Sequence, residues 1–269
     1  FKEKEKFICY LFTMNLRVFG SETGVMGYEF LETMKRLNNK KPFSYQPLSK
    51  DEVVNVDGSV FEILWPPAVV YDERTLSEIK RALKDFEKAL EEDAETRRLY
   101  DYVRKKDVFR VYFGEQEEKS EIQEYQEYQN QHINVKWKRK RLPEVVKKAD
   151  KSLKNAANHL SLAFFEDNRL LFLGDVENYE IRQIVDDLKS KGRNNFHIFI
   201  TPHHGTHWHN SLRQIKSAYS VTSNGKKLCS KMKIHFKEIS NRAFTTFANG
   251  DIVIPTYLAR EFLVGTIMV

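Results

Sequence analysis

The stretch from Leu160 to Ser211 constrains the fold most, because strand, turn, helix and strand patterns follow one another closely in it. Two apolar runs, 160–165 and 170–173, flank polar residues that favour a tight turn, and so they predict a β-hairpin. Apolar residues at helical spacing follow over 181–188, and the run 197–200 is typical of a buried strand. This alternation of strands with a helix predicts an α/β fold with packed layers.

Chemically active side chains stand just beyond the two later strands of this stretch. One strand leads into Asp175, and the other leads into a loop with four of the eight histidines of the chain, namely His203, His204, His207 and His209. Imidazole and carboxylate together suit zinc, manganese or iron, and a loop beyond a strand end leaves one ligand position open to water. The pattern therefore predicts a metal or active site, and the alternative is a histidine-rich surface loop without metal.

Three short motifs resemble the C-terminal half of the metallo-β-lactamase superfamily. They are NHLSL at 158–162, LFLGD at 171–175 and PHHGT at 202–206. They are most similar to the hydrolase domain of the ComEC type, known from DNA-uptake proteins, whose patterns are N-N-x-S-L, L-L-x-G-D and P-H-H-G-S. The resemblance covers roughly residues 40–71 and 155–255, and it implies a partial metallo-β-lactamase-like αββα sandwich.

The resemblance also implies a division of the chain into three parts. Residues 1–71 are expected to form the N-terminal part of the metallo-β-lactamase-like domain, and residues 158–269 its C-terminal part with Asp175 and the motif His203-His204-Gly205. Residues 72–157 fall between these parts and are expected to form a helical insertion.

Local patterns add further predictions. The Asp-Gly turn within 53–64 predicts a hairpin, and the apolar spacing over 76–90 predicts a helix that packs on another helix. Pro143 is expected to open a helix that reaches about Asn155. Residues 7–19 are expected to form a strand or buried segment, and residues 211–218 a helix.

The resemblance implies specific roles at the site. In that family two metal ions, usually zinc or manganese, activate a water that attacks phosphorus or a carbonyl carbon. Asp175 is expected to bridge the two ions, and His203 and His204 to act as ligands, with the order of the two histidines left open. Asp175 and His204 are then the expected catalytic residues. His159 is either a further metal ligand or a polar residue that forms hydrogen bonds near the site. Asn158 and Ser161 are expected to hold the loop by side-chain bonds to backbone.

Two regions are candidates for substrate binding. His207 and His209 are expected at the mouth of the site. The basic run that contains Lys136, Trp137, Lys138 and Arg139 can contact a phosphate backbone and stack a base, so nucleic acid is the expected partner. The net charge of +6 is compatible with an anionic substrate. Alternatively, the run is a solvated loop beside the acidic residues of 115–127.

The first metal motif of the superfamily, H-x-H-x-D-H, is absent from this sequence. Either the segment that carries it lies outside this chain, or the site is a remnant. The start at Phe1 rather than at a methionine favours the first explanation. An isolated half would expose a sheet edge and an apolar face, so we expect it to pair with the missing N-terminal half or with a partner protein.

The cysteine content and the hydropathy bear on the compartment in which the protein is expected. Cys9 and Cys229 are too few and too far apart for a disulfide framework, which suits a reducing cytoplasm, and no apolar run reaches the roughly 18 residues that predict a membrane span. The predicted function is a cytoplasmic, metal-dependent phosphodiesterase or nuclease. The alternative is a non-catalytic or partner-dependent subunit of a larger complex, such as an antiviral defence assembly, with half of the metal site.

Overall fold

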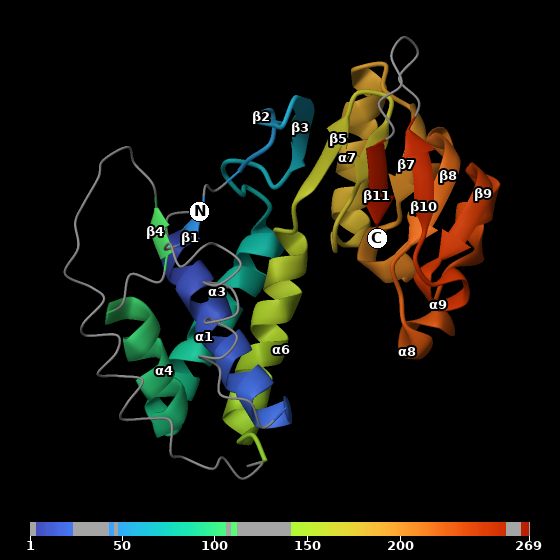
Figure 1. Ribbon diagram of the computed structural model, residues 1–269. Helices are drawn as coiled ribbons and strands as arrows, with labels where there is room; N and C mark the ends of the chain where they lie inside the picture. The colour runs from blue at the N-terminus through green and yellow to red at the C-terminus, as the bar shows by residue number, and fades with distance from the viewer. Residues whose placement is uncertain are drawn as a thin grey trace. The chain divides into compact units, whose positions relative to one another are not determined.

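A computed structural model describes six ranges of the chain: 4–23, 43–45, 48–105, 109–111, 141–256 and 265–268. The chain divides into two compact units (Figure 1). The helical unit takes Phe1–Pro47 and Tyr71–Ala156, and the sheet unit takes Leu48–Val70 and Ala157–Val269. Together they make an α/β protein, as the sequence predicts at this level. The predicted binding run Lys136, Trp137, Lys138 and Arg139 lies outside the described residues.

The described residues of the helical unit form four long helices: α1 (Lys4–Thr23), α3 (Glu73–Glu92), α4 (Ala94–Lys105) and α6 (Glu144–His159). Ile79, Leu83, Phe86 and Leu90 form the buried stripe of α3, which confirms the helix predicted over 76–90. A short parallel pair, β1 (Phe43–Tyr45) with β4 (Phe109–Val111), belongs to the same unit. The helix predicted after Pro143 is also confirmed, as α6.

Of the two expectations for residues 7–19, the buried segment is confirmed and the strand is wrong, because these residues lie in helix α1. Phe7, Tyr10, Met14 and Val18 recur at three or four positions and are buried together. A continuous apolar run does not distinguish a buried strand from a buried helix. Here Tyr10 of α1 stacks on Phe86 of α3, with the ring centroids 4.0 Å apart, as the two helices pack together. Residues 1–47 therefore group with the helices, and only 48–70 of the predicted N-terminal part join the sheet.

The sheet unit is built on a mixed seven-stranded sheet with the order β2-β3-β5-β6-β7-β8-β9. Pairing is antiparallel from β2 to β6 and parallel from β6 to β9. Both predicted hairpins, 53–64 and 160–173, are confirmed as antiparallel pairs. The strands are β2 (Val53–Val56), β3 (Ser59–Trp65), β5 (Ala163–Glu166), β6 (Leu170–Phe172), β7 (Asn195–Ile200), β8 (Lys216–Thr222) and β9 (Ser240–Thr245).

The two faces of this sheet are covered differently. Helix α7 (Asn178–Ser190) packs on one face over Leu171 and Phe199, which are fully buried. On the other face Ile198 and Val221 are buried with residues of β10 (Val253–Thr256), which pairs with β11 (Gly265–Met268). Five aromatic side chains on that second face are only partly buried: Phe61, Phe164, Phe172, Tyr219 and Phe244.

The helix predicted over 211–218 is wrong. A short 3-10 turn, η2 (Asn210–Gln214), ends at Ile215, whose backbone is extended, and β8 begins at Lys216. Parallel pairing of β8 between β7 and β9 outweighs the local helical pattern. The remaining short elements are η1 (Pro202–Gly205), α8 (Lys226–Cys229), η3 (Ile234–Glu238) and α9 (Thr246–Asn249). Among the described helices, none has the length and apolar character required to cross a membrane.

Candidate functional site

Loops from two adjacent parallel strands meet at one edge of the sheet. Parallel strands end at the same edge, and this edge of an α/β sheet commonly carries the ligand site. The loop after β6 carries Asp175 and Glu177, and the loop after β7 carries the histidines. A backbone hydrogen bond of 2.8 Å, from His203 N to Gly174 O, joins the two loops directly.

The backbone of the histidine loop adopts an unusual conformation. His203 (φ 47°, ψ 50°) and His204 (φ 55°, ψ 29°) are left-handed, and Gly205 follows at φ 76°. A left-handed residue with a side chain costs about 1–2 kcal/mol, so the surrounding structure must hold the turn. A Cβ at Gly205 would lie 2.6 Å from Thr222 Cγ2, so only glycine fits there. Strain of this kind concentrates at functional sites. Here the left-handed turn places the imidazoles of two successive residues in different positions.

The other loop is fixed at Gly174. This glycine has φ 57°, and a Cβ there would lie 2.5 Å from Leu162 O and 2.6 Å from Ser161 Oγ. Ser161 Oγ accepts a 2.8 Å hydrogen bond from the backbone N–H of Asp175. The expected role of Ser161 in holding the loop through a bond to backbone is thereby confirmed.

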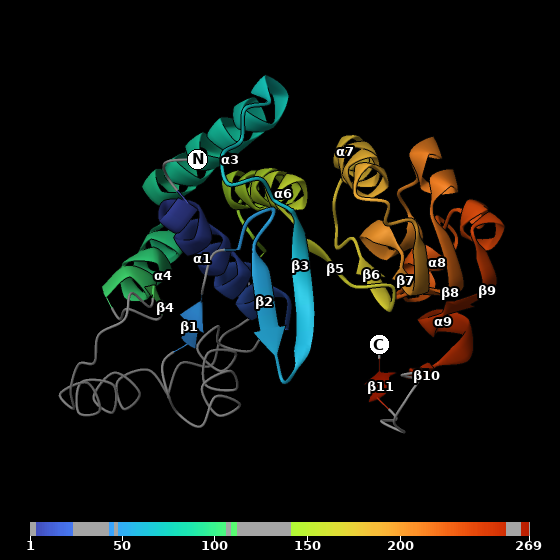
Figure 2. The ribbon, with the colours of Figure 1, turned by 90° about the horizontal axis from the view of Figure 1, so that it is seen from above.

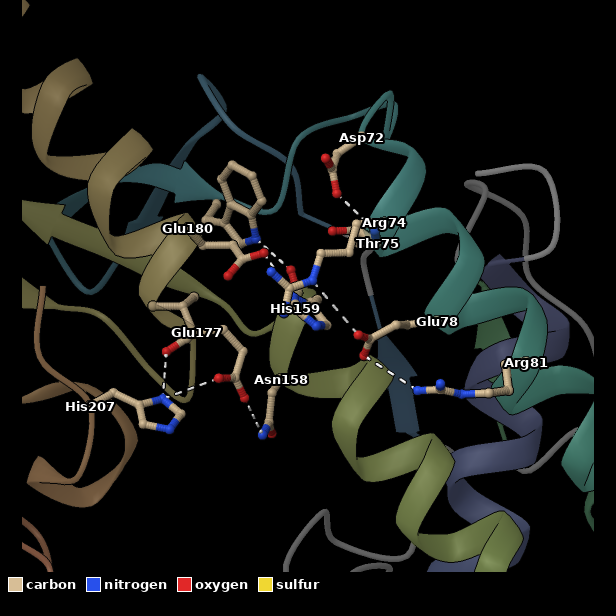
Figure 3. Close-up of polar contacts among 12 residues, drawn as sticks. Asp72, Arg74, Thr75, Glu78, Arg81, Asn158, His159, Glu177, Glu180 and His207 are labelled. Atoms are coloured by element: carbon tan, nitrogen blue, oxygen red, sulfur yellow. Dashed lines mark hydrogen bonds and ion pairs between the residues drawn. The ribbon is translucent and has the colours of Figure 1, made fainter.

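A compact group of possible ligands forms between the loops. Glu177, His203 and His207 each offer one ligand atom, and all three atoms lie within 4.8 Å of one another. His207 Nδ1 lies 3.4 Å from Glu177 Oε2, and the two side chains face each other in Figure 3. The rings of His203 and His207 stack with centroids 3.9 Å apart. We call these three residues the ligand triad.

Hydrogen bonds orient the His203 ring. The Thr206 hydroxyl donates to His203 O at 2.7 Å, which leaves its oxygen to accept from His203 Nδ1–H at 2.9 Å. The lone pair of His203 is therefore on Nε2, where Asn158 Nδ2 donates to it at 3.1 Å. Asn158 Nδ2 also donates to Glu177 Oε1 at 3.2 Å (Figure 3). One amide group thus bridges two members of the triad in the way that a cation does.

The protonation of His207 follows from its surroundings. Burial lowers the pKa of the His207 imidazole, and the nearby His203 ring lowers it further, while the Glu177 and Asp175 carboxylates oppose this shift. The net shift is downward, so the ring is neutral at neutral pH. A neutral imidazole is the form that binds a metal ion.

Asp175 and His204, predicted as ligands and catalytic residues, form a separate pair. Their closest atoms, Asp175 Oδ1 and His204 Nε2, lie 3.6 Å apart, and the two side chains are 45% and 44% exposed. His204 Nδ1 bonds to Ser223 O at 2.8 Å. The His203 and His204 ring centroids are 6.2 Å apart, so the pair lies beside the ligand triad without belonging to it.

His159 and His209 have other neighbours. His159 is buried, and its Nδ1 lies 2.8 Å from Oε1 of the fully buried Glu180 (Figure 3). This arrangement matches the alternative expectation for His159, a polar residue near the site, better than that of a metal ligand. His209 caps η2 by accepting from Ser211 N at 3.1 Å. The described contact of the His209 side chain therefore stabilises the start of η2.

Glu177 and Asn158 are site residues that the sequence reasoning missed as direct partners of the histidines. Glu177 occupies the N-cap of α7, yet its side chain makes no capping hydrogen bond and instead contacts Asn158 and His207. The sequence did contain an indication of Glu177, because this residue follows Asp175 by two positions in the same loop. The expected bond of the Asn158 side chain to backbone is wrong, because its Nδ2 donates to the side chains of Glu177 and His203, and nothing in its spacing indicates these acceptors.

Comparison of the chain with protein-family models, with curated proteins and with solved structures gave no match. The chemistry of the site therefore has to be argued from its own geometry.

The ligand triad fits a transition metal ion. Two imidazoles and one glutamate are the donor set of a common class of catalytic zinc site, with a fourth position open to water. Ligands of one zinc ion bind at about 2.0–2.2 Å, so they lie about 3.3 Å from one another in a tetrahedral arrangement. The 3.4 Å between His207 Nδ1 and Glu177 Oε2 agrees with that spacing. The hydrogen bond of His203 Nδ1 to Thr206 is the kind of outer contact that orients a metal-binding histidine.

Proposed function

We propose that this protein is a metal-dependent hydrolase of phosphodiesters, and specifically a nuclease. The observation that carries the proposal is the convergence of the ligand triad with the Asp175–His204 pair at one sheet edge. A bound zinc or manganese ion, or two ions if further ligands join, would supply an activated water near pH 7 and stabilise charge on the phosphate oxygens.

The side chains of the site have distinct roles in the proposed reaction. Glu177, His203 and His207 hold the cation, and Asn158 positions two of them. His204 donates its Nδ1–H to Ser223 O, so its Nε2 is left with a lone pair and faces Asp175. That nitrogen accepts the proton of the attacking water and returns it to the leaving oxygen, while the Asp175 carboxylate stabilises the protonated ring.

We propose further that the sheet unit is part of a metallo-β-lactamase-like αββα sandwich, with residues 72–157 as a helical insertion. An αββα sandwich packs two sheets face to face and covers their outer faces with helices. Two features support the assignment: α7 covers one face of the sheet, and the other face carries five partly buried aromatic side chains. The order of the three motifs along the chain supports it as well.

The second candidate function is a partner-dependent subunit. The partly buried aromatic face and the absence of an H-x-H-x-D-H motif from the sequence favour it. Under this proposal the chain binds metal weakly alone, and a partner that supplies further ligands completes the site. Exposed or half-exposed apolar patches commonly mark protein interfaces.

The experiment is cleavage of bis-p-nitrophenyl phosphate and of nucleic acid by the purified protein, in chelator and with added zinc or manganese. We expect Glu177→Gln and His203→Ala to abolish both metal binding and cleavage. We expect His204→Ala to retain metal and lose about 100-fold or more in rate, the range for a general acid–base group. His197→Gln is the matched control, because the Nε2 of this histidine contacts Pro255 O and lies outside the ligand triad. Cleavage at wild-type rates by all three site variants would overturn the proposal, and metal binding without any cleavage would favour the subunit.

A further inference from the structure

Positive charge is concentrated in one stretch of the sheet unit. The chain has 44 Lys and Arg against 38 Asp and Glu. Residues 203–250 hold eight of these cations and a single acid, Glu238, so the rest of the chain is nearly neutral. The net charge of +6 therefore belongs to the part of the sequence that begins with the histidine loop.

Most of these cations lie on one segment that contacts the histidine loop at two points. We call residues 224–237 the lysine segment. Ser223 O, just before it, accepts from His204 Nδ1–H at 2.8 Å, and Lys233 N donates to Gly205 O at 2.8 Å. Met232 packs close to Gly205, with Cγ 3.1 Å from where a Cβ would stand. The lysines are thereby held next to the Asp175–His204 pair.

The lysines themselves are available to an anion. Lys226, Lys227, Lys231 and Lys233 are exposed. Within the described ranges none of the four forms an ion pair, whereas Lys50, Lys148 and Lys191 each pair with an aspartate. Neighbouring cations of one sign raise the local positive potential, which draws in polyanions and is most effective near a site that acts on them.

An exposed aromatic ring adjoins the lysine segment. Asn224 N donates to Thr246 Oγ1, and Thr246 Oγ1 donates back to Asn224 O, both at 2.8 Å. These bonds attach the start of α9 to the start of the lysine segment, and α8 and α9 lie close together in Figures 1 and 2. Phe247, the next residue in α9, is 50% exposed. Exposed aromatic rings beside cations are the elements with which proteins stack unpaired bases.

We propose that the lysine segment and Phe247 bind single-stranded nucleic acid and bring a phosphodiester of the strand to the Asp175–His204 pair. The lysines contact the phosphates, and Phe247 stacks a base, which a duplex does not offer. This inference rests on the proposed function, because the bound strand is the substrate of the proposed hydrolase. The binding step itself requires no metal, so it is measured separately from cleavage.

The test is fluorescence anisotropy with labelled oligothymidylate of about 20 nucleotides, in chelator, over a range of salt. The test variant replaces Lys226, Lys227, Lys231 and Lys233 by Gln. The control replaces four exposed lysines elsewhere, Lys80, Lys84, Lys151 and Lys189, and so makes the same change in net charge. A duplex of the same sequence and vesicles of phosphatidylserine are measured in parallel.

We expect the test variant to lose at least tenfold in affinity and the control to stay within twofold of wild type. Each lost phosphate contact reduces the salt slope by about 0.7, so the test variant has a distinctly flatter slope. Phe247→Ala weakens single-strand binding and leaves duplex binding unchanged. Equal losses in the test variant and the control, or lysine-dependent binding of vesicles without binding of the oligonucleotide, would overturn the inference. Retained binding without cleavage in any metal would overturn the proposed hydrolase and leave the binding surface intact.

Discussion

His203 and His207 stack with their ring centroids 3.9 Å apart and their planes inclined by 28°. Two protonated imidazoles at this distance repel each other, and the His203 ring contributes to the lowered pKa of His207. Glu177 adds a negative charge beside them, with Oε2 3.4 Å from His207 Nδ1. The lowered pKa keeps the His207 ring neutral near pH 7, which is the form of imidazole that binds metal ions.

The first prediction concerns metal affinity. His203→Ala, His207→Ala and Glu177→Gln each remove one ligand, so we expect each to weaken zinc binding by more than the 10–100-fold that loss of an outer-shell partner causes. His235→Gln, which changes a histidine that contacts Glu238 instead, should bind zinc as the wild type does. Isothermal titration after chelator treatment gives the affinities. Mass spectrometry of the metal per chain gives the stoichiometry.

The same measurement distinguishes the two ligand sets. The resemblance implies Asp175, His203 and His204 as ligands, whereas the structure brings Glu177 and His207 together with His203. If Asp175→Asn and His204→Ala lose zinc while Glu177→Gln and His207→Ala retain it, the ligand triad is not the metal site.

The second prediction uses Asn158, whose amide donates to both Glu177 Oε1 and His203 Nε2. Asn158→Asp replaces this donor by a carboxylate. Without metal, the new charge repels Glu177, so the melting temperature should fall. With zinc, the carboxylate offers another ligand, so the rise in melting temperature on adding zinc should exceed that of the wild type. Thermal melts with chelator and with zinc measure both effects, and a zinc-induced rise smaller than in the wild type would contradict the triad geometry.

The third prediction concerns the hydroxyl of Thr206. It accepts from His203 Nδ1 and donates to His203 O, so it fixes the ring with its lone pair on Nε2. Thr206→Val keeps the shape of the side chain and removes the hydroxyl, and we expect zinc affinity to fall by about 10–100-fold. Thr206→Ser restores the hydroxyl and should restore most of the affinity. Equal affinities for the valine and serine variants would show that the hydroxyl does not orient the ring.

Local patterns in the sequence predicted much of the sheet unit. The Asp57-Gly58 turn and the polar turn at 166–169 each specified an antiparallel hairpin, because turn chemistry and alternation act over a few residues. The strand over 197–200 and the helix over 181–188 were predicted for the same reason. These features depend only on residues close together in the chain.

Features that depend on distant residues were not predictable in this way. The apolar residues 7–19 form a helix because they pack against α3 and α4, more than 50 positions later in the chain. At the site, the resemblance grouped Asp175 with both His203 and His204, whereas the turn at His203-His204 directs these two rings to different partners. Both backbones are left-handed, a conformation that no local pattern of histidines indicates.

The fourth prediction compares two glycines with similar backbones. Gly174 and Gly192 have φ 57° and φ 68°, so alanine at either one costs about 1–2 kcal/mol in backbone strain. A Cβ at Gly192 meets nothing within 4 Å, whereas a Cβ at Gly174 would lie 2.5 Å from Leu162 O. Gly174→Ala should therefore destabilise the protein clearly more than Gly192→Ala and displace the loop with Asp175. Urea unfolding of both variants measures the difference, and equal losses of stability would contradict the close packing at Gly174.

The last prediction concerns pH and the helical unit. Burial alone would raise the pKa of Asp85, but hydrogen bonds of 2.7 Å from Lys148 Nζ and Ser152 Oγ outweigh it and hold the pKa below its usual value. A carboxyl with a lower pKa in the folded state stabilises the protein above its unfolded pKa of about 3.9, and the stabilisation is lost as the pH falls through the folded value. Asp85→Asn should therefore be less stable than the wild type at pH 7, and the two should converge towards pH 3. Chemical unfolding across this range, with Asp101→Asn as the exposed control, measures the effect, and a stability difference independent of pH would show that the Asp85 charge is not its source.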